Sequence, residues 1–394
     1  MKNKKIIKSI VFLAVIAVLT ASIAVFISNI GFNKISAYFS VFTFSDEFNE
    51  DKQPLSTYNY DKLSSVEKQA YICVFNKIRS HPDYIKIPKL SKAEFSNVYF
   101  AVKNDNPDLL CFADSCNMIT FWSSAFLELH YDYTCEECDS MRDAMLDEVN
   151  AIVTKMPEMN DDYSKELYIH DYIVNNCNYE ETEHSSTAYG CLVDKKAVCS
   201  GYSRAIMLLL NELGIKSTLI GGTGISATQG SISHMWNIVW INESPYHVDV
   251  TWDDPGSDSD SAVSHIYFNL TDDEISFDHT DYDLGVDCNS DDYNYFVVNE
   301  LYFDSYGKKE LARIQQALIE NINGGINYLE IKFDSNEDYK TAASAIIDGS
   351  APGSDMYKII LYVSENAGDK VDISHVNFAR DDNKNYIRLM FDWK

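Results

Sequence analysis

The sequence predicts an α+β protein, and three features of its pattern support this fold class. Apolar residues recur at helical spacing through most of residues 36–160. An amphipathic helix and two segments of alternating polarity, typical of an antiparallel hairpin, follow within residues 161–290. Residues 291–394 then alternate between helical and strand patterns, which is typical of a small α+β domain.

The composition limits the classes of protein to consider. A chain of 394 residues is too long for one compact core and indicates two or three domains. Apolar residues make up 46% of the chain, which excludes wholesale disorder. Asp and Glu number 60 against 32 Lys and Arg, giving a net charge of −28. A nucleic-acid-binding protein needs a basic face, so this charge excludes nucleic acid as a partner.

Residues 1–35 have the composition of a cytoplasmic basic tail followed by a membrane anchor. Lysines in the first eight residues precede the uncharged stretch 9–30. Its apolar part, residues 10–27, would span roughly 27 Å as a helix, close to the thickness of a bilayer core. We therefore expect a single-pass protein of the cell membrane, held through this N-terminal helix, with an extracellular C-terminal portion. The alternative is a secreted protein whose signal peptide is cleaved near residues 21–24, although residues 25–27 prolong the apolar run beyond that site.

Residues 36–160 form a mostly helical N-terminal region in this prediction. Ser64 and Glu67 have the spacing of a capping box, and Ser91 starts a second helix in the same way. Pro107 marks the end of that second helix, because proline disfavours helical geometry in the residue before it. The aromatic stretch that follows is interpreted as a strand.

A helix that begins at Cys199 is the central element of residues 161–290. Its apolar residues share one face, and Gly214 follows as a natural C-terminal stop. Cys199 therefore lies in the first turn, where the positive end of the helix dipole favours the thiolate over the thiol. The free backbone amides of the same turn can receive the oxyanion that forms when a sulfur attacks a carbonyl.

The predicted hairpin consists of two alternating segments and a turn: Ser233–Ile241, Tyr246–Trp252 and Asn242–Pro245. Any register with an odd residue sum across the turn places His234 and Asp249 on one face of the sheet. A tight turn at Asn242–Pro245 would set Asp249 opposite Ile238, several residues from His234. A contact between the two side chains then requires a bulge or a strong twist.

A cysteine at a helix start, with a histidine and an aspartate on adjacent strands, has the layout of a thiol acyl-transfer centre. In that layout His234 takes or holds the proton of the Cys199 thiol, while Asp249 fixes the imidazole tautomer and stabilises its cation. His247 lies on the same face and is the competing base. Structural alternatives are a small apolar residue at a helix end for the cysteine, and a hydrogen-bonded sheet histidine for either histidine.

The C-terminal segment, residues 291–394, is predicted to contain two helices and four strands, and its pattern suits a domain for substrate or wall attachment. The helices are Lys308–Asn323 and Asn336–Asp348. The strands are Ile326–Phe333, Tyr357–Val363 and two between Val371 and Trp393.

Three motifs resemble those of the transglutaminase-like superfamily, in particular its bacterial exported branch. The motifs are Ala197-Val198-Cys199-Ser200-Gly201-Tyr202, His234-Met235-Trp236-Asn237 and His247-Val248-Asp249-Val250-Thr251-Trp252-Asp253. They occur in order, at spacings of 35 residues from the cysteine to the first histidine and 15 from there to the aspartate. The resemblance implies an α+β fold with a papain-like transglutaminase core, in which the cysteine helix packs on an antiparallel sheet.

The resemblance also assigns roles to single residues. Cys199 becomes the nucleophile, His234 its base and Asp249 the orienting group, while His247 becomes a neighbour of the site. We expect no metal and no other cofactor, because no cluster of ligands matches the calcium sites of eukaryotic family members.

An oxyanion site in this family pairs the cysteine's backbone amide with an upstream side chain, commonly Trp or Gln in better-known relatives. No tryptophan lies in residues 123–198, so Tyr189 or Tyr179 would have to serve in this chain. Trp236 and Trp252 are expected to wall the cleft, with core packing as the alternative for each.

The chemistry that the family shares is attack of the thiolate on a peptide or glutamine carboxamide carbonyl, which gives a thioester. Water as acceptor makes the enzyme a cysteine peptidase, and an amine makes it a protein cross-linking transferase. Many exported relatives look protease-like, so hydrolysis is favoured over cross-linking. The expected substrate is an extracellular or cell-wall protein or peptide. The alternative function is a catalytically inactive surface module that binds or scaffolds other molecules.

Overall fold

A computed structural model of the chain has an α+β architecture, which confirms the predicted fold class. It divides into two compact units, Met1–Arg142 and Asp143–Lys394. The division of the chain beyond residue 35 into three domains, 36–160, 161–290 and 291–394, stays a prediction. The residues that the structure describes are 44–50, 52–110, 112, 115–226, 228–256, 263–282, 285–347 and 351–394.

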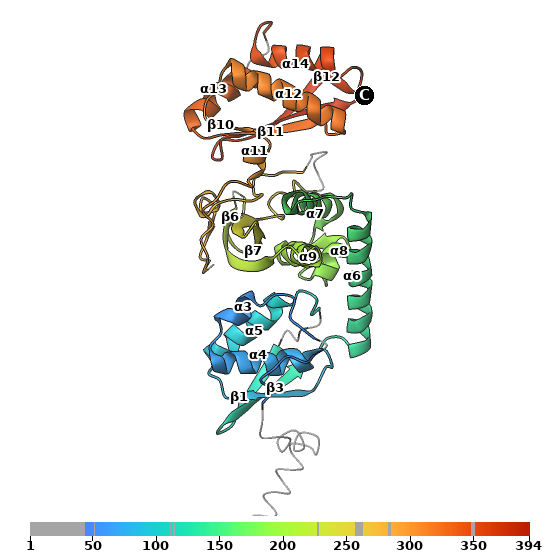
Figure 1. Ribbon diagram of the computed structural model, residues 1–394, viewed down its shortest axis with the longest axis vertical. Helices are drawn as coiled ribbons and strands as arrows, with labels where there is room; N and C mark the ends of the chain where they lie inside the picture. Colours follow the sequence, from blue (N-terminus) through green and yellow to red (C-terminus); the bar gives the residue numbers. More distant parts are fainter. Residues whose placement is uncertain are drawn as a thin grey trace, which may run out of the picture. The chain divides into compact units, whose positions relative to one another are not determined.

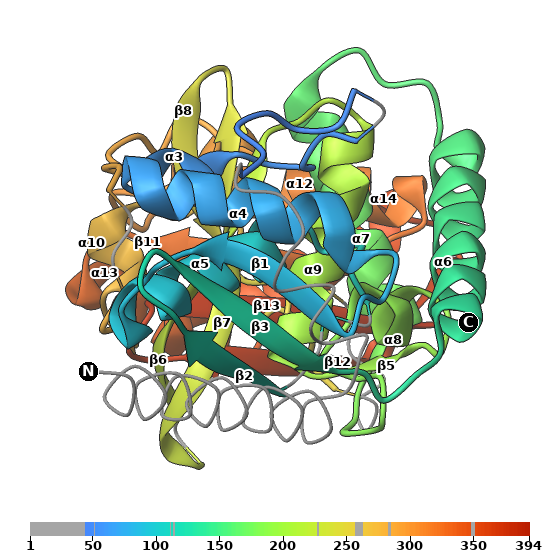
Figure 2. The same cartoon turned by 90° about the horizontal axis from the view of Figure 1, so that it is seen from below.

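The first unit contains three helices that lie on one face of an antiparallel sheet (Figures 1 and 2). The helices are α3 (Tyr58–Lys62), α4 (Ser65–Ile78) and α5 (Lys92–Asp105). The strands are β1 (Tyr84–Pro88), β2 (Ser115–Thr120) and β3 (Ser124–His130), in the order β1-β3-β2. Capping boxes at Ser64–Glu67 and Ser91–Glu94 start α4 and α5, as the sequence predicts.

The second unit begins within α6 (Cys135–Lys155), and its first half contains three further helices and a four-stranded antiparallel sheet; the last of these helices packs on the sheet and the other two pack against that helix. The helices are α7 (Asp162–Asn176), α8 (Ala188–Leu192) and α9 (Cys199–Glu212). The sheet has the order β8-β7-β6-β9 and contains β6 (Ser217–Ser226), β7 (Gly230–Ile241), β8 (Ser244–Val248) and β9 (His279–Thr280). Because α9 packs against β6 and β7, the predicted core, a cysteine helix on an antiparallel sheet, is confirmed.

The turn of the β7–β8 hairpin is shorter than predicted. The strands pair up to Ile241 opposite Ser244, so that Asn242 and Glu243 alone form the loop. Both residues have positive φ, 48° and 68°, as a two-residue turn of type I′ requires. Glutamate is uncommon in this left-handed region, so the residue types gave little indication of such a turn.

The shorter turn shifts the strand pairing by two residues. His247 lies opposite Ile238, and the same register continued puts Asp249 opposite Trp236. An even shift keeps every side chain on its face, so His234 and Asp249 share a face as predicted. Asp249 also comes two residues closer to His234, within reach of a diagonal cross-strand pair, and the contact needs no bulge.

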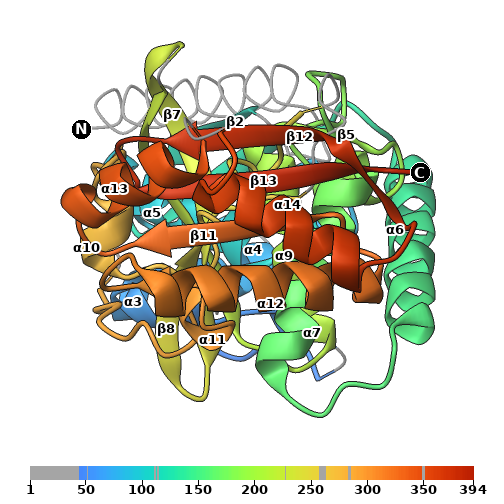
Figure 3. The ribbon, with the colours of Figure 1, turned by 90° about the horizontal axis from the view of Figure 1, so that it is seen from above.

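The rest of the second unit contains two short helices and a C-terminal α+β layer. The short helices are α10 (Asp272–Ile275) and α11 (Tyr295–Val298). Three longer helices lie on one face of the C-terminal sheet (Figures 1 and 3): α12 (Lys308–Gly324), α13 (Asn336–Ile346) and α14 (Asp355–Asn366). The sheet has the order β10-β11-β13-β12 and contains β10 (Tyr302–Phe303), β11 (Tyr328–Phe333), β12 (Val371–Asp381) and β13 (Tyr386–Trp393).

One predicted strand is wrong, because residues 357–363 belong to helix α14. Ser354 caps this helix by accepting a hydrogen bond from the backbone amide of Tyr357. Met356, Ile359 and Val363 are buried at helical spacing. A short apolar run fits either a strand or a buried helix, and here the cap decides for the helix.

The prediction of a single-pass membrane protein, and with it the membrane and transmembrane assignments, is contradicted and is withdrawn. None of the helices in the part of the chain that the structure describes is long and apolar enough to cross a bilayer. The longest, α6, has 21 residues but carries eight charged side chains. The segment on which the prediction rested, residues 1–35, lies outside the described residues. The secreted alternative stays a prediction.

Candidate active site

Cys199 is the first residue of α9, and the chain reaches it directly from β5 (Lys196–Ala197). It is partly exposed, whereas every residue in 201–210 is buried. Gly201 allows this packing, because a Cβ at that position would lie only 2.2 Å from the carbonyl oxygen of Ser185. The glycine of the Cys-Ser-Gly motif thus lets the helix start pack against the preceding loop, while Cys199 stays partly exposed at the positive end of the helix dipole.

Two polar side chains fix the start of α9 to β7. The Ser203 hydroxyl lies 2.8 Å from the carbonyl oxygen of Cys199 and 2.9 Å from that of Met235. The side-chain amide of Asn237 donates to the Ser203 carbonyl at 3.0 Å. Since Met235 follows His234 in the chain, these bonds hold the thiol beside the imidazole. The Cys199 side chain is close enough to the His234 ring to help raise the pKa of His234.

His234 and Asp249 form a buried pair, in which the carboxylate meets the imidazole at the ring nitrogen Nε2. Nε2 of His234 lies 2.6 Å from Oδ2 of Asp249, and the two residues are 4% and 0% exposed. The backbone amides of Thr251 and Trp252 donate to Oδ1 of Asp249 at 3.0 and 3.3 Å, which fixes the carboxylate. Because Asp249 occupies Nε2, the ring nitrogen available to the sulfur is Nδ1.

Charge interactions set the protonation of this pair. Burial lowers the pKa of His234, but the charge of Asp249 and the hydrogen bonds to Asp249 and Cys199 raise it to about 10. Burial raises the pKa of Asp249, but the charge of His234 and the hydrogen bonds from His234 and His279 bring it well below its usual range. At neutral pH the pair is therefore an imidazolium next to a carboxylate.

His279 of β9 binds the same carboxylate as His234. Its Nε2 lies 3.0 Å from Oδ2 of Asp249, and its Nδ1 lies 2.7 Å from Oδ1 of Asp278. Burial lowers the pKa of His279, but the bonds to the two aspartates raise it. Asp278 in turn accepts from the Tyr267 hydroxyl and the Lys384 ammonium, both at 2.7 Å. The sequence has no local signal for this contact, since 30 residues separate His279 from Asp249.

His247, the competing base, is a structural residue. Its Nδ1 accepts a hydrogen bond from the indole N–H of Trp236 at 2.9 Å, and its Nε2 lies 2.9 Å from Oδ1 of Asp272. Burial lowers the pKa of His247 to about 4, although Asp272 acts in the opposite direction. Both ring nitrogens are engaged away from the sulfur, so the ring is neutral and cannot serve Cys199.

The structure brings Tyr179, and not Tyr189, to the sulfur. The Tyr179 hydroxyl interacts with the backbone amide of Cys199, which acts to lower the pKa of Tyr179. Burial raises the pKa of Tyr179, and the charges of Cys199 and Asp249 raise it further. Tyr189 instead packs edge-on against the ring of His184. Of the two tyrosines that the sequence proposed, Tyr179 is therefore the one that interacts with Cys199.

The two tryptophans that were expected to wall the cleft lie in different environments. Trp236 is fully buried and belongs to the core of the sheet. Trp252 is partly exposed and packs on His234, with ring centroids 5.0 Å apart. Gly224 makes room for it, because a Cβ there would lie 2.8 Å from the Trp252 ring. Only Trp252 is placed to shape the approach to the imidazole.

A buried cation near the sulfur was not anticipated from the sequence. The Arg204 guanidinium donates to the carbonyl oxygens of Ser186 and Ser200, both at 3.0 Å. Burial lowers the pKa of Arg204 to about 10, and the charge of Cys199 acts in the opposite direction.

Three groups of side chains in the described residues have the composition of metal ligands: His234, Asp249 and His279; His247, Asp272 and Cys288; His170, Asp171 and His265. The first group is the site just described. In the second, Nδ1 of His247 accepts the Trp236 N–H, so the ring proton is on Nε2 and that nitrogen has no lone pair for a metal. The third group lies outside the active site.

Comparison with known proteins relates the central part of the chain to one family. Residues 150–252 match the sequence model of the Transglutaminase-like superfamily, a segment that contains Cys199, His234 and Asp249. No curated protein matches the chain.

Six chains from solved structures match, and three of them are compared by sequence identity, TM-score and coverage. They are a candidate cysteine protease from Cytophaga hutchinsonii (14% identity, TM-score 0.25), a TGase (12%, 0.27) and a candidate protease from Parabacteroides distasonis (9%, 0.22). The matches cover 35%, 45% and 34% of this chain, and this chain spans 61%, 53% and 35% of theirs. These are partial similarities, so the site is argued from its own geometry.

Proposed function

The chain carries a transglutaminase-like domain in residues 150–252, and from this premise we propose that it is a thiol-dependent acyl-transfer enzyme. Cys199 is the nucleophile, His234 its acid and base, and Asp249 the group that orients and charges the imidazole. The proposal rests on one observation. The buried imidazole of His234 lies 2.6 Å from the fully buried carboxylate of Asp249 and interacts with the side chain of Cys199, a partly exposed residue at the start of a helix.

The reaction begins with attack of the Cys199 thiolate on the carbonyl carbon of a peptide bond or a glutamine carboxamide. A carbon–sulfur bond forms and an electron pair moves to the carbonyl oxygen. The His234 imidazolium then gives its proton to the leaving nitrogen as the carbon–nitrogen bond breaks, which leaves a thioester. In the second half His234 takes a proton from the acceptor as it attacks, and the sulfur leaves as the thiolate, which restores the resting pair.

Tyr179 supplies the oxyanion donor in this mechanism. The Tyr179 hydroxyl interacts with Cys199 and can turn its own hydrogen toward the carbonyl oxygen of a substrate that the cysteine attacks. A donor in this place stabilises the negative oxygen that develops in the tetrahedral intermediate. The family resemblance implies an upstream oxyanion donor. We assign this role to Tyr179 because, of the two candidate tyrosines, it is the one that interacts with Cys199.

Hydrolysis is the favoured second half-reaction, with cross-linking as the alternative. The thioester would form on a partly exposed residue, where water can reach it. A transferase has to keep water away from the thioester long enough for an amine to attack.

The test of the proposal is the selective reactivity of Cys199. Near pH 6 an ordinary thiol is less than about 1% ionised, so iodoacetamide should label Cys199 roughly 100-fold faster than any other thiol of the chain. Cys116 is a matched control, because it is partly exposed like Cys199 while burial raises the pKa of its thiol. The fast phase should disappear in Cys199→Ala and persist in Cys116→Ala. Uniformly slow labelling would contradict the proposal and favour a binding module.

A second measurement separates the two acceptors. A glutamine-bearing protein is incubated with the enzyme and a fluorescent primary amine, and both amine incorporation and new N-termini are quantified. Release of N-termini that is lost in Cys199→Ala supports a peptidase, and incorporation supports a transferase. If neither new N-termini nor amine incorporation is found although Cys199 reacts with iodoacetamide, the enzyme must act on a narrower set of substrates than the protein tested.

A further inference from the structure

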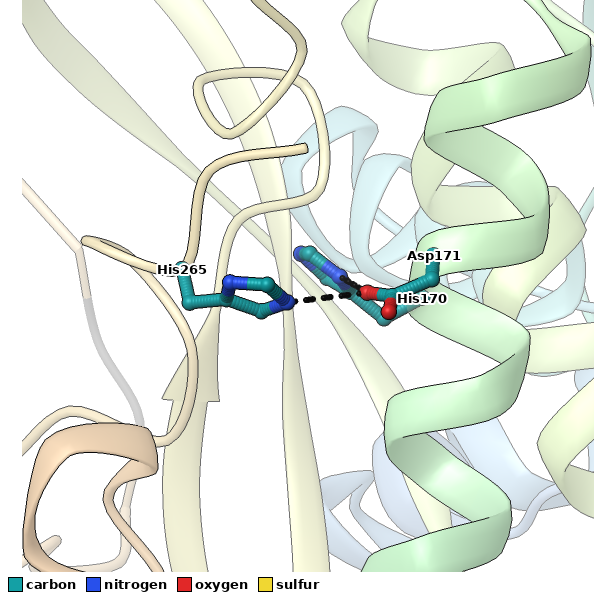
Figure 4. A group of neighbouring side chains, drawn as sticks. All are labelled: His170, Asp171 and His265. Atoms are coloured by element: carbon teal, nitrogen blue, oxygen red, sulfur yellow. Dashed lines mark hydrogen bonds and ion pairs between the residues drawn. The ribbon is translucent and has the colours of Figure 1, made fainter. Parts of the chain in front are cut away.

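The group formed by His170, Asp171 and His265 lies outside the active site, between α7 and the loop before α10 (Figure 4). Oδ1 of Asp171 is the point on which the two rings converge. It lies 2.9 Å from Nδ1 of His170 and 3.0 Å from Nε2 of His265. The two histidines are buried, whereas the Asp171 side chain is 37% exposed.

The outer nitrogens of both rings are held by buried carboxylates. Nε2 of His170 lies 3.1 Å from Oδ2 of Asp253, and Nδ1 of His265 lies 2.6 Å from Oε2 of Glu330. Both carboxylates are completely buried. Histidines that bind metals almost always donate their other ring N–H to such a carboxylate, which fixes the tautomer and makes the inner nitrogen a better ligand.

The charged groups of the cluster sum to a net negative charge that two positive charges would balance. Three carboxylates, those of Asp171, Asp253 and Glu330, face one guanidinium, that of Arg388, which donates to Glu330 at 2.8 Å. If each imidazole carries only its outer proton, the sum is −2. A net charge of this size in a mostly buried cluster is costly, and either two further protons on the rings or one divalent cation would balance it.

We propose that His170, Asp171 and His265 bind one divalent transition-metal ion of the zinc class. The ligands are Nδ1 of His170, Nε2 of His265 and a carboxylate oxygen of Asp171, with water at the fourth position. Two imidazoles and one carboxylate suit Zn²⁺, whereas Ca²⁺ and Mg²⁺ prefer oxygen ligands alone. Bonds of about 2.0–2.1 Å in a tetrahedron set ligand atoms roughly 3.3 Å apart, a few tenths of an ångström wider than the present nitrogen–oxygen distances.

The metal would act as a structural link in the second unit. Asp171 belongs to α7 and His265 precedes α10, so one ion would link these two segments directly. The link extends to β11 of the C-terminal sheet through the contact between His265 and Glu330. Asp253 closes the turn that begins at Asp249, since its backbone amide donates to the Asp249 carbonyl at 3.2 Å. Occupancy should therefore stabilise the turn that carries the orienting carboxylate, and this proposal departs from the expectation of no metal.

The experiment uses the untagged full-length chain, stripped with a chelator and carrying Cys199→Ser to remove the catalytic thiol as a competing ligand. Titration with Co²⁺ should give the visible absorption of a tetrahedral site without a sulfur band, at one ion per chain. One equivalent of Zn²⁺ should displace it. His265→Gln should weaken Co²⁺ binding by at least about 100-fold, and Asp253→Asn, which removes an outer partner, by about 10- to 100-fold.

Two controls keep the test decisive. His184→Gln alters another histidine–carboxylate pair, with Asp194 at 2.8 Å, and should bind Co²⁺ as tightly as the parent. Asp171→Asn changes a partly exposed ligand and should lose binding while its circular dichroism stays that of the parent, which covers the case in which His265→Gln fails to fold. Absence of stoichiometric Co²⁺ binding, or binding that survives Asp171→Asn, overturns the proposal.

Discussion

His234 and His247 lie on neighbouring strands and on one face of the same sheet, yet they carry different charges at neutral pH. The pKa of His234 is raised to about 10, whereas that of His247 is lowered to about 4. Burial lowers the pKa of both rings, so the difference comes from their partners. The comparison separates an imidazole that can do acid–base chemistry from one that holds the sheet together.

The partners differ in burial and in what meets the second ring nitrogen. The Asp249 carboxylate is fully buried and lies 2.6 Å from His234, whereas the Asp272 side chain is 33% exposed and lies 2.9 Å from His247. Water weakens the field of the exposed carboxylate. The second nitrogen of His234 faces a thiol, but that of His247 accepts the Trp236 N–H, which a protonated ring could not do.

The largest expected effect comes from the same substitution at the two histidines. His234→Gln removes the proton carrier and should lower kcat/KM by roughly 10⁴ or more. His247→Gln should keep the activity within about tenfold but lower the free energy of unfolding by about 1–3 kcal/mol, because the Trp236 N–H loses its acceptor. The checks are steady-state kinetics and urea unfolding of both variants. Equal losses of activity would remove the distinction between the two rings.

The two carboxylates provide the next test. Asp249→Asn should reduce kcat by about 10⁴, since the amide can hold the wrong imidazole tautomer and cannot stabilise the cation. Asp272→Asn should change kcat by no more than a few-fold, because it supports the structural histidine. The measurement is kcat for both variants at neutral pH. A large loss in Asp272→Asn would mean that His247 contributes to the chemistry.

Tyr179 and Tyr189 form a matched pair for the oxyanion assignment. Tyr179→Phe should lower kcat by about 10²- to 10³-fold with little change in KM, as expected when a donor acts on the transition state. Tyr189→Phe, which changes a ring packed on His184, should leave kcat unaltered. If the two variants behave alike, the oxyanion donor must be another group.

The sequence predicted the parts of this site that depend on local pattern. A helix start at Cys199 follows from one apolar face and a glycine stop, and the shared face of His234 and Asp249 follows from the two-residue period of a strand. The exact pairing did not follow, because a type I′ turn at Asn242 and Glu243 shows no glycine. Because the register differs from the predicted one by an even number of residues, His234 and Asp249 still lie on one face, although the turn was predicted wrongly.

Contacts between distant segments could not be predicted. His279 reaches Asp249 across 30 residues, and no periodicity within a single chain reports such a pair. The choice between Tyr179 and Tyr189 depended on how the short β4–β5 pair (Asn178–Tyr179 with Lys196–Ala197) meets the start of α9. The helix at residues 357–363 was missed because a short apolar run fits strand and helix equally well.

The last prediction concerns the pH dependence of stability, in which the two histidines should act in opposite directions. The folded pKa of His234, about 10, lies above the ordinary 6.5, so its ion pair contributes fully below about pH 6.5 and is lost as the pH rises to about 10. The folded pKa of His247, about 4, lies below 6.5, so the contribution of its neutral ring is present above about pH 6.5 and is lost as the pH falls toward 4.

Unfolding in urea between pH 5 and 9, in a chain that retains Cys199, measures this difference, and tryptophan fluorescence suits it because four of the five tryptophans lie in the second unit. One proton corresponds to a slope of about 1.4 kcal/mol per pH unit. His234→Gln should remove a fall of this slope on the alkaline side, and His247→Gln a rise of this slope on the acid side. If both variants flatten the same side, the two rings share one protonation state, and the partner carboxylates do not distinguish them.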